Sequence, residues 1–124
     1  MNVLKVVLRV IGVVQLVLGA VLLVPGLFES VAGLDPAPEW VSWMFAMFAA
    51  RSIGFGYGML VAANNPEGNV AWIKAMIGVQ AIDWIATIAY LATGAVTLSQ
   101  VTTAVFLPLV FIFILARRLP RPVS

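Results

Sequence analysis

Four polar residues set in long apolar segments are the side chains of this chain best placed to do chemistry. Arg51 interrupts the second apolar segment and Asp83 the third, where Gln80 precedes Asp83 by about one helical turn; Gln15 lies in the first. A guanidinium and a carboxylate can form a two-point ion pair, and a carboxylate can also exchange protons. We call Arg51, Asp83, Gln80 and Gln15 the polar cluster.

The composition excludes many kinds of chemistry. The 124 residues include no cysteine and no histidine, which removes thiol catalysis, disulfides, iron–sulfur ligation and the usual ligand of haem, copper or zinc. Asp83 is the only acid inside an apolar segment. We therefore expect no metal site, no cofactor and no enzymatic activity, and the scattered net charge of +2 argues against nucleic-acid binding.

The apolar excess predicts a membrane protein. Hydrophobic residues make up 63% of the chain and charged residues 10%, against about 25% charged in soluble domains, and the mean hydropathy is +1.10. Since a helix of ~20 apolar residues crosses a bilayer and must bond its own backbone, we predict an all-α integral membrane four-helix bundle. Residues 1–124 form one transmembrane domain, with spans at about 5–28, 40–63, 70–93 and 98–116; Pro108 predicts a kink in the last.

The distribution of basic residues predicts the orientation. Six of the seven flank the same set of span ends: Lys5, Arg9, Lys74, Arg117, Arg118 and Arg121. The opposite side carries Glu29, Asp35 and Glu39. The positive-inside rule therefore places both termini and the turn at 64–69 in the cytoplasm. The N-terminal segment also resembles a cleaved signal peptide, but its charge-free run is longer than the usual one.

The turn at 64–69 also suggests a partner for the arginine. Arg51 lies 15 residues before Pro66, and Asp83 lies 16 residues after Glu67. On antiparallel helices of equal rise these positions reach nearly the same depth. An ion pair between Arg51 and Asp83 would cancel two charges that are costly in lipid. We expect this pair, with Gln80 and Gln15 beside it, either to fix the registry of two helices or to form a site for an anion or a proton.

Small residues predict how the second span packs. They recur at every fourth position, which is typical of close helix approach: Ala46, Ala50, Gly54, Gly58 and Ala62. The third span carries a polar stripe at helical spacing: Met76, Gln80, Asp83, Thr87, Tyr90 and Gly94. We expect these faces to converge inside the bundle.

The chain resembles small bacterial membrane proteins of the DoxX-like and BphX-like kind. The resemblance covers the four-span layout with its Gly/Pro-rich first outer loop, and at residue level it rests on Arg51, Gly54 and Gly58 and on the "IDW" of Ile82–Trp84. It implies a multi-pass protein of the bacterial inner (plasma) membrane and names no reaction.

Three functions compete. The first is a non-catalytic accessory or structural subunit, in contact with membrane lipids and with other integral membrane subunits of a larger complex, because the chain has almost no mass outside the membrane. The second is a small oligomeric transporter or channel that uses Arg51 and Asp83. The third, ranked last, is an enzyme acting on a lipid or quinone, because a carboxylate opposite an arginine is a poor acid–base group.

Overall fold

The computed structural model describes residues 2–121, which form helices joined by short connections and contain no strand. Four helices are long and apolar enough to cross a membrane. The all-α prediction with four such helices is therefore confirmed. The elements are α1 (Asn2–Leu23), α2 (Leu27–Ala32), α3 (Glu39–Asn64), the 3-10 turn η1 (Glu67–Asn69), α4 (Val70–Ala92) and α5 (Leu98–Arg117).

The first long helix ends earlier than the sequence pattern suggests. The apolar run predicts a span to residue 28, but α1 ends at Leu23. Pro25 disfavours helical backbone at the residue before it, and Gly26 adopts a left-handed conformation with a φ of 79°. The chain therefore turns there and forms the short helix α2, which starts inside the predicted first span and continues into the expected outer loop.

The last helix is irregular at a position that the sequence does not mark. The sequence predicts a kink at Pro108, but the non-helical residue inside α5 is Val101, with a φ of −122° and a ψ of 19°. The helix starts at a capping box, in which Thr97 and Gln100 satisfy each other's backbone N–H groups. Pro108 itself is buried, so it contributes to the packing of α5.

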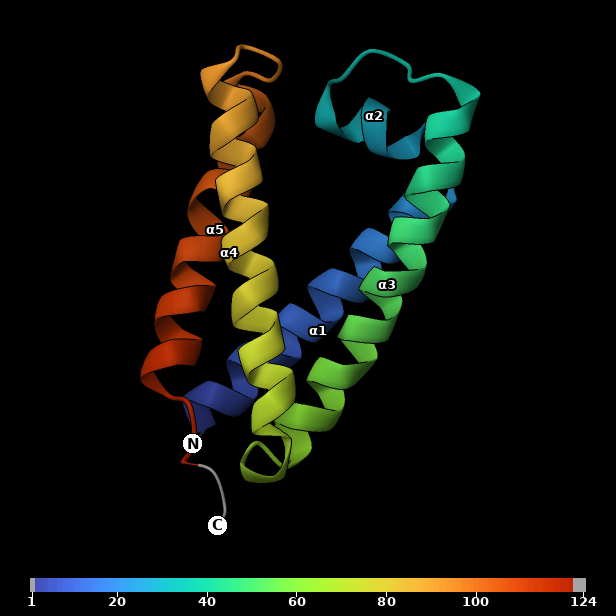
Figure 1. The fold of residues 1–124 in the computed structure, drawn as a ribbon. Helices are drawn as coiled ribbons and strands as arrows, with labels where there is room; N and C mark the ends of the chain where they lie inside the picture. The colour runs from blue at the N-terminus through green and yellow to red at the C-terminus, as the bar shows by residue number, and fades with distance from the viewer. Residues whose placement is uncertain (1, 122–124) are drawn as a thin grey trace.

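The helices associate as two pairs, α1 with α3 and α4 with α5 (Figure 1). Glycines let the backbones of α1 and α3 come close together: a Cβ added at Gly56 would lie 2.8 Å from the carbonyl oxygen of Gly12. One added at Gly19 would lie 3.1 Å from the carbonyl oxygen of Ala49. Side chains larger than hydrogen at these glycines would force the two helices apart.

This contact corrects the predicted packing ridge of α3. Of its five small residues, Ala62 is buried in the core and Gly58 is covered by the Trp72 ring, but Ala50 and Gly54 are exposed and Ala46 is only partly buried. The reason is the helical period of 3.6 residues, which turns each fourth position by about 40°. Over Ala46–Ala62 the ridge drifts by roughly 160°, so it cannot face one neighbour throughout.

The hydrophobic core lies at one end of the molecule. It combines the start of α1, the end of α3, the start of α4 and the end of α5: Leu4, Leu8, Ile11, Met59, Ala62, Ala63, Ile73, Met76, Phe111 and Leu115. At this end the Phe55 and Trp72 rings of α3 and α4 meet edge to face at 5.7 Å. Within residues 2–121, α4 buries nothing beyond Gln80 and α5 nothing before Pro108. The two pairs therefore diverge toward the other end, as Figure 1 shows.

The two ends of the molecule differ in charge. The start of α1, the turn after α3 and the end of α5 lie together at the core end (Figure 1), so Lys5, Arg9, Lys74 and Arg117 gather there. Acidic residues of α2 and of the segment before α3 lie at the open end. Between the ends, exposed side chains are largely apolar, including Val6, Val13, Val17, Ile82, Ile85 and Phe113.

A single methyl group tests the close approach of α1 and α3. In Gly56→Ala the new Cβ meets backbone of α1, so we expect the free energy of unfolding to fall by about 1–3 kcal/mol. Gly54→Ala on the same helix is the control, because its Cβ meets nothing within 4 Å, and stability should stay equal or rise by up to ~1 kcal/mol. Denaturation of the detergent-solubilised proteins measures both. Equal stability of the two variants would contradict the contact.

Candidate functional site

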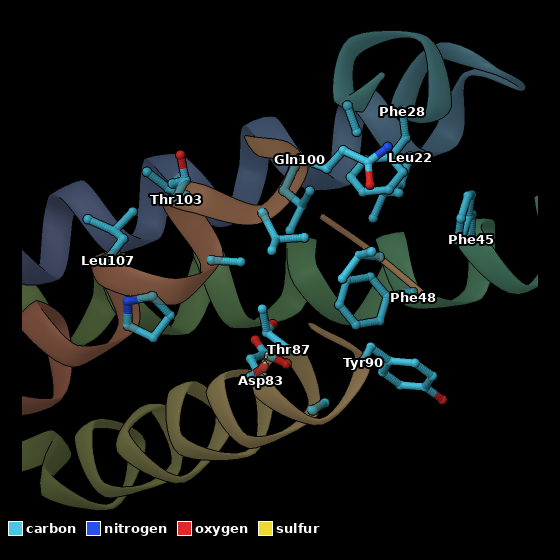
Figure 2. Close-up of a pocket in the computed structure, with 18 of the residues that line it drawn as sticks. Leu22, Phe28, Phe45, Phe48, Asp83, Thr87, Tyr90, Gln100, Thr103 and Leu107 are labelled. Carbon is cyan, nitrogen blue, oxygen red and sulfur yellow. Dashed lines mark hydrogen bonds between the residues drawn. The ribbon is translucent and has the colours of Figure 1, made fainter. Parts of the chain in front are cut away.

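The divergence of the two helix pairs opens a cleft with a volume of about 890 Å³. All five α-helices contribute to its lining, which is mostly apolar and includes the aromatic side chains Phe28, Trp40, Phe45, Phe48, Tyr90 and Phe111. In Figure 2, Asp83 and Thr87 project from α4 into this space, with Phe48 and Tyr90 beside them. The volume falls in the range of small-molecule pockets.

Three members of the polar cluster line this cleft together. Gln15 reaches it from α1, and Gln80 and Asp83 reach it from α4. Gln15 and Gln80 are buried, with exposed fractions of 9% and 5%. The predicted polar stripe of α4 is also recovered as one face, because Met76 is buried in the core while Thr87 and Tyr90 line the cleft above Asp83. Gly94 lies beyond the end of α4.

The fourth member, Arg51, is placed elsewhere, which corrects the predicted ion pair. Its side chain is exposed and does not line the cleft, and its Nη1 donates a hydrogen bond to the backbone oxygen of Met47 at 3.0 Å, one turn back on its own helix. Within residues 2–121 no hydrogen bond, and no ion pair within 4 Å, joins Arg51 to Asp83. The two charges therefore do not neutralise each other in this structure.

The packing of the helices explains why the pair does not form. Arg51 lies 13 residues before the end of α3 and Asp83 lies 13 residues after the start of α4, so the predicted match in depth, about 20 Å from the turn, is sound. However, α3 takes α1 as its close partner, and its contacts with α4 are few beside those with α1. At the depth of Arg51 the two helices have already separated.

One hydrogen bond from a side chain crosses the mouth of the cleft. The Nε2 of Gln100, at the start of α5, donates to the backbone oxygen of Gly33, which follows α2, at 3.2 Å. The Oε1 of the same amide accepts the backbone N–H of Thr97 at 2.9 Å. In Figure 2, Gln100 lies near Phe28 and Leu22. Gln100 was not singled out from the sequence, although its capping-box spacing to Thr97 is a recognisable signal.

The second pair of helices is linked by a partly buried donor. The indole Nε1 of Trp84 donates to the backbone oxygen of Val105 at 2.9 Å, which links α4 to α5. Trp84 directly follows Asp83, so this bond orients the carboxylate side of α4 toward the cleft. The sequence places Trp84 deep in a span, but the choice of acceptor depends on how the two helices pair.

Glu29 is a further residue whose environment the sequence did not reveal. It lies in α2 and is 6% exposed, and its Oε1 has no hydrogen-bond partner among the described residues. A buried acceptor without a partner costs about 1–3 kcal/mol. Glu29 does not line the cleft, although its neighbours Phe28 and Ala32 do. We assign it no role in the site.

The chemistry available in the cleft is recognition of a ligand by a few polar groups. Residues 2–121 contain no cluster of three or more Asp, Glu, Cys or His side chains that could hold a metal ion. Asp83 offers a carboxylate, Gln15 and Gln80 offer amides, and Thr87 uses its hydroxyl to donate to the backbone oxygen of Asp83 at 2.8 Å. The site therefore combines one acid with a largely apolar wall.

A double-mutant cycle tests the separation of Arg51 and Asp83. Because the two side chains do not interact, the effects of Arg51→Gln and Asp83→Asn on the free energy of unfolding should add to within about 0.5 kcal/mol in the double variant. Denaturation of the four proteins in the same detergent gives the coupling term. A coupling above roughly 1 kcal/mol would show that the ion pair forms in solution.

No family model, curated protein or solved structure matches the chain significantly. The resemblance to the DoxX-like and BphX-like proteins stays a prediction from Arg51, Gly54, Gly58 and residues 82–84.

Proposed function

We propose that this chain is a multi-pass integral membrane protein that acts as a non-catalytic accessory subunit of a larger membrane complex. Its four apolar helices and their outward-facing valine, isoleucine and phenylalanine side chains suit a lipid environment. The positive-inside rule puts both termini in the cytoplasm, and the resemblance to bacterial proteins makes the membrane the inner one.

The observation that carries this proposal is the exposed Arg51. It lies near the middle of α3 and has no acidic partner within the described part of the chain. An arginine at the centre of a lipid-facing helix costs about 2.5–3.5 kcal/mol on insertion scales. A carboxylate or carbonyl group of a neighbouring subunit would remove this cost, because buried charges are normally paired.

The surroundings of Arg51 suit contact with a second transmembrane helix. Ala50 and Gly54 are exposed beside it, and a Cβ added at Gly54 would meet nothing within 4 Å. Small residues at a helix surface allow a neighbouring backbone to approach closely. Ala50 and Gly54, the part of the α3 small-residue ridge that does not pack within the protomer, can therefore contact a helix of another subunit. We call Met47, Ala50, Arg51 and Gly54 the α3 flank.

Purification from the source organism in mild detergent tests the proposal. We expect a larger integral membrane protein to co-purify at a fixed ratio with the tagged chain. Arg51→Gln and Gly54→Leu should each reduce this partner roughly tenfold or more, which corresponds to the loss of about 1.4 kcal/mol of binding. Quantitative mass spectrometry of the purified fractions measures the ratio.

Gly78→Leu is the matched control, because Gly78 lies on α4 and is also open, with nothing within 4 Å of an added Cβ. Its partner recovery should equal that of the unmodified chain. The accessory role would be refuted if Gly54→Leu recovered as much of the partner as the unmodified chain does. It would also be refuted if the chain purified alone and monodisperse in every mild detergent.

The open cleft favours one alternative, a small oligomeric transporter or channel. Asp83 faces this space from mid-span, and one protomer is too thin to enclose a wide path, so several copies would be needed. Vesicles containing the purified protein should then conduct protons or inorganic cations, measured with fluorescent indicators, and Asp83→Asn should abolish the signal. Flux no higher than in protein-free vesicles would exclude this alternative for those ions.

A further inference from the structure

The polar groups that line the cleft use little of their hydrogen-bonding capacity within the described residues. Gln15 is nine-tenths buried, lines the cleft, and makes no side-chain hydrogen bond within residues 2–121. The amide of Gln80 donates to the sulfur of Met76 at 3.3 Å, a weak acceptor. Asp83 is exposed where it borders the cleft, and its carboxylate accepts no hydrogen bond from the described residues; the hydroxyl of Thr87 bonds the backbone oxygen of Asp83 instead. Unused hydrogen-bonding capacity in an apolar cavity points to a ligand.

Aromatic side chains from three helices line the cleft together with Asp83. Phe45 and Phe48 come from α3, Phe28 from α2, and Tyr90 from α4 about two turns beyond Asp83. Figure 2 shows Phe48 and Tyr90 near Asp83 and Thr87, with Phe28 and Phe45 farther along the cleft. The negative faces of aromatic rings attract cations, and more strongly where water is excluded.

The charge inside the cleft is not balanced. Asp83 is the only charged residue among those that line it. Arg51, the nearest basic residue in depth, is exposed on α3 and bonds its own helix. A lone carboxylate with aromatic walls is complementary to a positive charge that carries apolar groups, and it repels an anion of the same shape.

We propose that the cleft binds one hydrophobic organic cation per protomer. Asp83 neutralises its charge, Phe48 and Tyr90 contact its apolar groups, and Gln15 and Gln80 bond any N–H or O–H donors that it carries. The site lies within one protomer and rests on the cleft alone, so it does not depend on the docking of a partner at the α3 flank.

Binding of tetraphenylphosphonium to the purified chain in a nonionic detergent tests the proposal. Equilibrium dialysis against protein-free micelles of the same detergent corrects for partitioning. We expect saturable binding of about one cation per protomer, since one acid, Asp83, lines the cleft. Tetraphenylborate, an anion of nearly the same size and shape, should not bind saturably. Equal binding of the two ions by the unmodified protein would overturn the proposal without any variant.

Substitutions then locate the site. Asp83→Asn should weaken tetraphenylphosphonium binding roughly tenfold or more, the factor that one lost ion pair represents, and Asp83→Glu should restore part of it. Asp35→Asn, which removes an acid outside the cleft, should change nothing. Phe48→Ala should also weaken binding, whereas Phe106→Ala, a loss of a phenylalanine that does not line the cleft, should not.

Folding of each variant is checked by its unfolding midpoint and its elution volume. If Asp83→Asn does not fold, Phe48→Ala and the comparison of tetraphenylphosphonium with tetraphenylborate still test whether the cleft binds a cation. A folded Asp83→Asn protein that binds the cation as tightly as the unmodified chain, or the absence of saturable cation binding, would show that the cleft is not a cation site.

Discussion

The close approach of α1 and α3 determines the shape of this molecule. At Gly12 and Gly56 the two backbones are so near that no side chain fits between them, and Gly19 repeats the contact higher up. A helix in contact with one neighbour at this distance cannot follow another along its whole length. Consequently α3 leaves α4 soon after their shared turn, where Trp72 lies against Gly58 and Phe55, and α4 pairs with α5.

This arrangement leaves two charges, those of Asp83 and Arg51, without an oppositely charged partner among residues 2–121. The acid and amides at the floor of the cleft face a space that no helix fills, and the arginine of α3 faces outward next to small residues. A compact bundle would have buried both. In lipid, unpaired charges are costly, so a protein that retains them is expected to find partners outside its own chain. The two proposals above follow from the two separate places where this occurs.

The long helices and the polar face of α4 could be predicted from sequence because they depend on local properties. Apolar runs set three of the four long helices to within one residue at each end, and the stripe from Met76 to Tyr90 follows helical spacing. The predicted end of α1 at residue 28 was wrong, although Pro25 and Gly26 mark the earlier end in the sequence. Which helix packs against which could not be predicted from these local patterns. A small residue at every fourth position allows close contact with any neighbouring helix. The expected Arg51–Asp83 pair matched the depth of the two residues but assumed that α3 and α4 stay together.

The division into two pairs has a further meaning for biogenesis. Each pair is continuous along the chain, with α1 and α3 both before residue 65 and α4 and α5 both after residue 69. Proteins are made from the N-terminus and their units form in that order. The contacts between α1 and α3 therefore need no residue of the second pair, whereas the contacts between α4 and α5 need the last helix of the chain. This arrangement favours assembly as two successive helix pairs over simultaneous packing of four helices.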